Sequence, residues 1–134
     1  MKLIGYERSG TRDPWIFFKN GYFYHCYSHA GGIAVGKSQT IEGLATAEPV
    51  VVYVPESGKP YSKELWAPEL HVIDGKCYIY VACDDGDNRN HRMYVLYNDS
   101  ADPQAAYKLK GKIFDRTDKW AIDGTVLQYG GELY

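Results

Sequence analysis

The chain carries little net charge and has no long apolar run. Its 134 residues have a formal net charge of −2, so no basic patch favours nucleic acid as a partner. No apolar stretch approaches the roughly 20 residues that a membrane-spanning helix needs, and residues 1–10 lack the hydrophobic region of a signal peptide. These absences argue against nucleic-acid and membrane partners. They leave a cytoplasmic protein, or a secreted one whose signal peptide has been removed.

Cysteine and histidine are scarce, and neither is spaced as in a metal site. The odd number of cysteines favours small buried apolar residues in a reducing compartment over a disulfide or a catalytic nucleophile. The four histidines share no ligand spacing, and we therefore expect no metal site from them. The residues concerned are Cys26, Cys77 and Cys83, and His25, His29, His71 and His91.

What the chain has in abundance is tyrosine and glycine, and a hairpin pattern that occurs three times. The copies are residues 13–24, 67–78 and 123–134. Each runs from a motif residue through an apolar strand to an x-Gly turn and ends on a tyrosine. A repeat of roughly 50 residues with several strands per unit is typical of a β-propeller, one blade per repeat. A propeller needs about four to eight blades to close, so we interpret the chain as a partial propeller of about two and a half blades.

The strand pattern is all β, and Asn20-Gly21 and Asp74-Gly75 are strong signals for tight hairpin turns. Ala101–Ala106 is the one place where a helical turn is expected. The first strand of each hairpin is almost continuously apolar, which predicts burial on both faces between neighbouring blades. Blade one is expected at about 12–54, blade two at about 65–113, and the start of blade three at 120–134. The expected strands are 15–19, 22–28, 33–37, 50–54, 69–73, 77–83, 92–97 and 107–113.

The repeat register places Asp13, Ala67 and Asp123 at equivalent ends of three successive inner strands. Inner strands of a propeller surround a central channel, so their equivalent ends meet at one mouth. We therefore expect two carboxylates from different blades to face one pocket, as general acid–base chemistry on an acetal requires. The alternative is that Asp-Pro and Asp-Gly only mark turns.

Several segments resemble glycoside hydrolase family 43 in order and spacing, over nearly the whole chain. They are residues 12–16 (RDPWI), 65–70 (LWAPEL) and 120–125 (WAIDGT). Residues 84–95 (DDGDNRNHRMYV) are similar to the branch of α-L-arabinofuranosidases and exo-arabinanases. The resemblance implies the N-terminal part of a five-bladed propeller that hydrolyses arabinose- or xylose-containing glycans with inversion.

The resemblance also implies roles for the two carboxylates. Asp13 matches the general base that activates water, and Asp123 matches the carboxylate that raises the pKa of the general acid and orients it. The acid itself is a glutamate on a later blade, and nothing in this chain matches it; Glu132 is expected to be a strand residue. We therefore predict that these 134 residues alone have no glycosidase activity.

Other residues are expected to support the pocket. Trp66 is interpreted either as an apolar wall against the sugar or as a wedge between blades. Arg12 and Glu69 are candidate substrate-binding residues, Glu69 either orienting Arg12 or a loop or serving as a strand-end charge. His91 contacts substrate if the acidic loop 84–91 reaches the pocket mouth. That loop does not fit calcium-loop spacing, so this segment does not support the calcium ion of the family's central channel, and no cofactor is expected.

The sequence leaves three alternatives open. The first is a β-xylosidase or endo-arabinanase of the same family, and the second is a carbohydrate-binding propeller without catalysis. The third is a kelch- or WD-type interaction module, whose blade signatures the chain lacks. Exposed blade edges and apolar blade faces also predict self-association of an open arc of blades.

Overall fold

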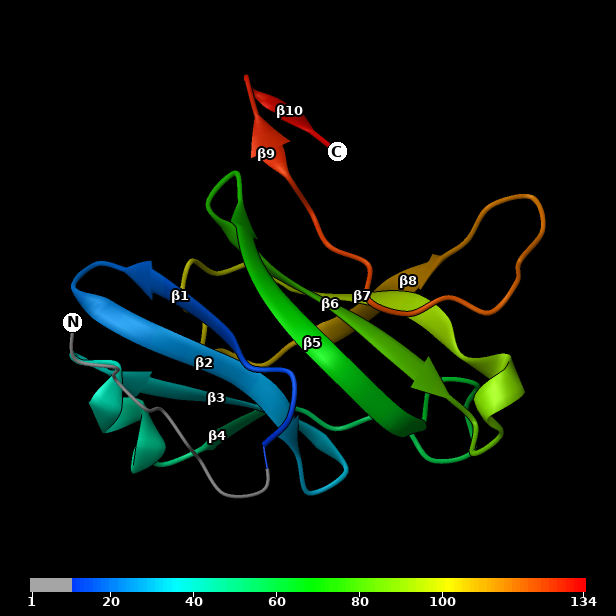
Figure 1. Ribbon diagram of the computed structural model, residues 1–134, viewed down its shortest axis with the longest axis horizontal. Helices are drawn as coiled ribbons and strands as arrows, with labels where there is room; N and C mark the ends of the chain where they lie inside the picture. Colours follow the sequence, from blue (N-terminus) through cyan, green and yellow to red (C-terminus); the bar gives the residue numbers. More distant parts are fainter. Residues whose placement is uncertain (1–10) are drawn as a thin grey trace, which may run out of the picture.

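The first two repeats each fold into a four-stranded antiparallel sheet in which every strand pairs with the next along the chain (Figure 1). This computed structural model describes residues 11–134, so the expectation about a signal peptide in residues 1–10 lies outside the described residues. The chain is an all-β partial propeller, as the sequence predicts. The first sheet contains β1 (Trp15–Lys19), β2 (Tyr22–His29), β3 (Gly32–Ser38) and β4 (Val50–Tyr53), and the second contains β5 (Lys63–Ile73), β6 (Lys76–Asp84), β7 (Arg92–Asn98) and β8 (Lys108–Ile113).

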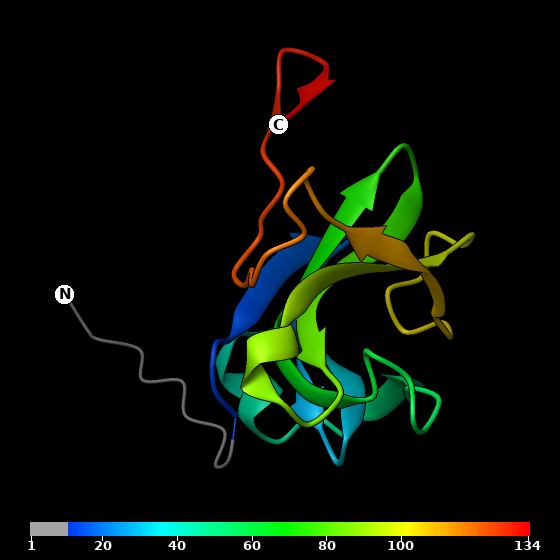
Figure 2. The same cartoon turned by 90° about the vertical axis from the view of Figure 1, so that its right-hand side faces the viewer.

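The third repeat forms a short hairpin of β9 (Gln128–Tyr129) and β10 (Glu132–Leu133). This hairpin projects away from the two sheets in both views (Figures 1 and 2). Leu127 and Tyr134 extend the pairing, because the backbone N–H of each donates to the carbonyl of the other at 2.9 Å. Its apolar side chains at Leu127, Tyr129, Leu133 and Tyr134 are exposed.

The hairpin turns of the three repeats share one backbone conformation. Both central residues have positive φ in each turn, as a two-residue type I′ turn requires, and its twist matches that of the flanking strands. Glycine at the second position accepts this conformation without a steric penalty. The φ values are 50° and 82° at Asn20-Gly21, 49° and 75° at Asp74-Gly75, and 61° and 85° at Gly130-Gly131.

The hydrophobic core joins the two sheets. Residues from β2 and β3, such as Cys26 and Val35, belong to the same buried cluster as Leu70 and Ile79 of the second sheet. Trp15 and Phe17 of β1 are partly buried and pack against this cluster. All three cysteines are buried and free, as expected of small apolar residues.

Some local predictions were wrong. β1 is not buried on both faces along its length, because Phe18 is 61% exposed. β5 begins at Lys63 rather than Glu69, since two irregularities in its pairing with β6 let it run through Pro68. Residues 101–106 form turns, whereas short 3₁₀ helices occur at η1 (Glu42–Ala45) and η2 (Asn88–Asn90). Within residues 11–134 no helix is long and apolar enough to cross a membrane.

Candidate active site

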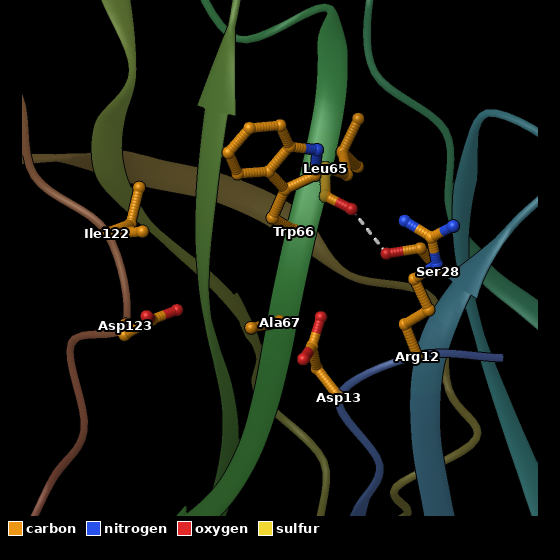
Figure 3. A pocket seen from close by; sticks show the side chains of 8 residues that line it. All are labelled: Arg12, Asp13, Ser28, Leu65, Trp66, Ala67, Ile122 and Asp123. Carbon is orange, nitrogen blue, oxygen red and sulfur yellow. Dashed lines mark hydrogen bonds between the residues drawn. The ribbon is translucent and has the colours of Figure 1, made fainter. Parts of the chain in front are cut away.

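A pocket of about 450 Å³ takes its lining from all three repeats (Figure 3). Its size is within the range of small-molecule sites. The structure therefore brings together Arg12, Asp13, Trp66 and Asp123, four of the six residues singled out in the sequence. The full lining is Arg12, Asp13, Ser28, Leu65, Trp66, Ala67, Ile122 and Asp123.

The three register-equivalent residues of the repeats share a left-handed backbone. The φ angles are 50° at Asp13, 43° at Ala67 and 56° at Asp123. This conformation costs a non-glycine residue roughly 1–2 kcal/mol, and aspartate tolerates it better than most. Its occurrence at the start of each repeat shows that one local geometry turns the chain at the pocket mouth three times.

The two aspartates enter the pocket from either side of β5. Asp13 precedes β1, and Asp123 lies on the segment that leads to β9. In Figure 3 the carboxylates flank the position of Ala67, and the carboxyl group of Asp123 is directed toward it. The repeat register anticipated this convergence, whereas the catalytic roles of the two carboxylates stay a prediction.

Trp66 lies between two irregularities of β5. The pairing register with β6 shifts once between Lys63 and Trp66 and again between Trp66 and Glu69, and each irregularity contains a left-handed residue, Glu64 (φ 45°) and then Ala67. Bulges bend a strand and redirect its side chains, and they are frequent beside active sites. Here they place Trp66 in the pocket lining, and its indole Nε1–H donates to the Glu64 carboxylate at 3.1 Å.

Two hydrogen bonds tie the blades together beside the pocket. The hydroxyl of Ser28, in β2, donates to the carbonyl of Leu65 in β5 (Figure 3). The indole N–H of Trp15 donates to the carbonyl of Leu70 at 2.7 Å. These bonds hold β5 against the blade that carries Asp13, so they set the spacing across the pocket.

Glu69 lies outside the pocket lining. Its Oε2 accepts a hydrogen bond from the Thr125 hydroxyl at 2.6 Å and lies 3.0 Å from Nε2 of His71. Because Thr125 follows Asp123 by two residues, Glu69 holds the segment that presents Asp123. Of its predicted roles, the structure favours orienting a loop, and this loop is not that of Arg12.

His91 does not line the pocket either, and its side chain is fully buried beneath Trp66. The structure therefore does not support the direct contact between His91 and substrate that was expected from the sequence. The neighbouring Arg89 is exposed and pairs with Asp87, lowering the pKa of that carboxyl to about 2. Residues 85–90 of the acidic loop form a surface turn capped by its own side chains.

The sequence did not identify Ser28, Leu65 and Ile122 as pocket residues. Leu65 directly precedes Trp66 and Ile122 directly precedes Asp123, so these two residues could have been predicted from the neighbouring motif residues. Ser28 gave none, because it reaches the pocket through contact between sheets. Among residues 11–134, no three His, Cys, Asp or Glu side chains gather closely enough to hold a metal ion.

The chain is similar to known proteins in sequence and in fold. Residues 8–134 match the family described as Glycosyl hydrolases family 43. An extracellular exo-alpha-(1->5)-L-arabinofuranosidase of Streptomyces avermitilis is 32% identical over 89% of this chain and 26% of its own length. Alpha-L-arabinofuranosidase 43 of Humicola insolens is 34% identical over 91% of this chain and 24% of its own length.

A solved structure is similar as well. The alpha-L-arabinofuranosidase from Lactobacillus brevis has a TM-score of 0.83 and 32% sequence identity, over 92% of this chain and 42% of that one. The chain thus spans about a quarter of the length of these curated relatives.

Proposed function

Because the chain belongs to the glycosyl hydrolases of family 43, we propose that the protein containing it releases arabinose from α-L-arabinofuranosyl glycans. The observation that carries this proposal is the convergence of Asp13 and Asp123 on one pocket with Trp66 in its wall. Paired carboxylates suit the acid–base hydrolysis of an acetal. An indole presents an apolar face on which the C–H groups of a sugar pack.

In this mechanism Asp13 is the general base. Its carboxylate takes a proton from a water molecule as that water attacks the anomeric carbon and the bond to the leaving group breaks. A carboxylic acid, expected to be a glutamate of a later blade, protonates the leaving oxygen. The product has inverted configuration because water enters opposite the leaving group.

Asp123 has an electrostatic and orienting role. Its negative charge in the same pocket favours the protonated form of a nearby carboxylic acid, because a like charge disfavours ionisation. Glu69 holds the Asp123 segment through Thr125. Arg12 supplies the positive charge in the pocket lining and is proposed to bind sugar hydroxyls.

The names of two similar proteins refine the proposal. The Streptomyces relative is named an extracellular exo-alpha-(1->5)-L-arabinofuranosidase, and the Lactobacillus structure is that of an alpha-L-arabinofuranosidase. We therefore assign exo action on α-1,5-arabino-oligosaccharides, and secretion, to the full-length protein. Its presence in culture medium rather than in cells would support secretion.

The test is hydrolysis of α-1,5-arabino-oligosaccharides by the full-length protein and by its Asp13→Asn variant. Loss of the general base should lower kcat by about 10²–10⁴-fold. Asp74→Asn is the matched control, since Asp74 has a similar φ of 49° in the hairpin turn, outside this pocket. It should leave kcat unchanged.

Product analysis distinguishes the alternatives. Arabinose released from chain ends with inverted initial configuration supports the proposal. Xylose release from xylosides, or internal cleavage of linear arabinan, would instead assign the xylosidase or endo-arabinanase activity. Glycan binding without hydrolysis would assign a binding propeller, and wild-type kcat in Asp13→Asn would overturn the role of Asp13.

A further inference from the structure

His91 is a buried histidine that the proposed chemistry does not use. It directly follows η2 in the connection between β6 and β7, and both it and Asp84 have no exposed surface. The two ring nitrogens face different oxygen atoms. Nε2 lies 3.1 Å from the carbonyl oxygen of Glu64, and Nδ1 lies 2.9 Å from Oδ2 of Asp84.

These contacts define which nitrogen donates. A backbone carbonyl only accepts, so Nε2 must carry a hydrogen to bond Glu64. Nδ1 and Oδ2 of Asp84 have no other hydrogen-bond partner within residues 11–134, so these two buried atoms satisfy each other. The other oxygen of Asp84 accepts from the backbone N–H of Gly86 at 2.8 Å. Because Nε2 already carries one hydrogen, the contact between Nδ1 and Oδ2 needs a second one, held either on Nδ1 of a doubly protonated ring or on the Asp84 carboxyl, and in both arrangements Asp84 orients the ring.

His91 contacts Trp66 in the pocket wall, and it contacts Glu64 two residues earlier in β5. Its ring lies against Trp66, with ring centroids 4.0 Å apart and planes inclined by 30°. Its hydrogen bond holds the carbonyl of Glu64, whose left-handed backbone forms the first irregularity of β5. The same Glu64 accepts the indole N–H of Trp66 through its carboxylate. The position of the indole is therefore determined by His91 from beneath and by Glu64 from the side.

A third contact reaches the segment that carries Asp123. The backbone carbonyl of His91 accepts from the N–H of Ala121 at 3.2 Å, two residues before that aspartate. It also accepts from the Arg92 side chain at 2.8 Å. The residue thus connects the acidic loop, the bulged part of β5 and the start of the third repeat.

We propose that His91, oriented by Asp84, is a positioning residue that holds Trp66 in place as the sugar-binding wall of the pocket. For its catalytic consequence this inference rests on the proposed function. A phenylalanine would fill the same space and keep a ring against Trp66. It would leave the Glu64 carbonyl without its donor, and the strained backbone there would relax. The polar pair is therefore required for geometry rather than for filling volume.

The first measurement needs no substrate. In the full-length protein, the indole N–H resonance of Trp66, assigned with Trp66→Phe, reports the position of that ring. His91→Phe should shift or broaden this resonance, and His91→Gln should largely restore it because its amide N–H can donate to Glu64. His25→Phe is the control, since His25 is equally buried but lies in β2 of the other sheet.

The histidine itself gives a second spectroscopic signature. The Nε2 resonance of His91 should be that of a protonated nitrogen at neutral pH, with a slowly exchanging hydrogen. A resonance showing Nε2 as the unprotonated nitrogen would overturn the proposal. An unchanged Trp66 indole resonance in His91→Phe would overturn it as well.

The kinetic measurement separates positioning from chemistry. His91→Phe should raise KM for arabino-oligosaccharides about tenfold, the size expected when one hydrogen bond is lost, with kcat changed less than about threefold. In a Trp66→Ala background it should add little, because both changes remove the same wall. Independent, multiplying effects of the two variants would refute the inference.

The two proposals fail in different ways. If the protein hydrolyses no arabinoside while the Trp66 and Nε2 resonances behave as stated, the positioning role of His91 stands and the proposed substrate is wrong. If hydrolysis occurs and His91→Phe behaves like His25→Phe in every measurement, the enzyme assignment stands and His91 is an ordinary core residue.

Discussion

The hydrogen bond between Trp15 and Leu70 links the two blades that flank the pocket, and its removal should destabilise the protein measurably. Trp15 lies two residues after Asp13, and its indole N–H donates to the carbonyl of Leu70 at 2.7 Å. Leu70 is 1% exposed, so water cannot replace the lost donor. Trp15→Phe keeps an aromatic ring in the position but removes this bond.

The expected cost follows from the environment of the acceptor. A typical hydrogen bond contributes about 1 kcal/mol net, but a buried acceptor left without its donor loses roughly 1–3 kcal/mol. Some packing is also lost, since phenylalanine is smaller than tryptophan. We expect Trp15→Phe to lower the free energy of unfolding by about 2 kcal/mol.

The other two tryptophans provide matched controls. The indole N–H of Trp66 donates to the carboxylate of Glu64, an exposed residue. The indole N–H of Trp120, a residue that is 48% exposed, donates to the side-chain oxygen of Asn88 at 3.4 Å. Water can replace both donors, so Trp66→Phe and Trp120→Phe should each cost less than about 1 kcal/mol.

Equilibrium urea unfolding of the full-length protein and its three variants, followed by circular dichroism, measures these costs. The free energy of unfolding should fall with urea concentration at the same slope in all four proteins. Their unfolding midpoints can then be compared directly. Equal costs for all three substitutions would refute the reasoning, because the expected difference comes from burial of the acceptor. A deficit in Trp15→Phe alone would support it.

Further predictions concern backbone strain, acid and alkali. Asp13→Ala should lower the free energy of unfolding by about 1 kcal/mol, whereas Asp13→Asn should change it by less than about 0.5 kcal/mol, because asparagine tolerates a φ of 50°. Thermal unfolding of the two variants tests this prediction, and equal stabilities would contradict it. Hydrogen bonds from Lys112 and Arg92 lower the pKa of Asp118 below its ordinary 3.8. The stabilising contribution of the Asp118 carboxylate is therefore present above pH 3.8, and it is lost as the pH falls through the lower pKa of the folded state. Wild type and Asp118→Asn should therefore differ in urea midpoint at pH 7 and converge in acid, and a constant difference would exclude the ion pair as its cause. Burial raises the pKa of the Cys83 thiol from 9.0 to about 12, so its contribution to stability is present below pH 9 and lost as pH rises toward 12. In the native protein at pH 8 an aromatic disulfide should label this thiol only at the rate of unfolding, and immediate labelling would contradict its burial.

The sequence by itself determined the repeat and its local geometry. The x-Gly pairs specify type I′ turns, because two successive residues with positive φ are strongly selective for Asn, Asp and Gly. Turns of one type at one spacing give hairpins of one register, and this register placed Asp13 and Asp123 at equivalent positions. These features depend on residues close together in the chain, and they could therefore be predicted from it.

The tertiary structure decided what lies around those two carboxylates. The bulges of β5 that direct Trp66, and the burial of His91 beneath it, have no local sequence signal, since they arise from the pairing of β5 with β6 and from the return of the acidic loop. The bond from Glu69 to Thr125 joins residues 56 positions apart. Which side chains meet across such distances depends on how sheets pack, and packing is a property of the whole fold rather than of any segment.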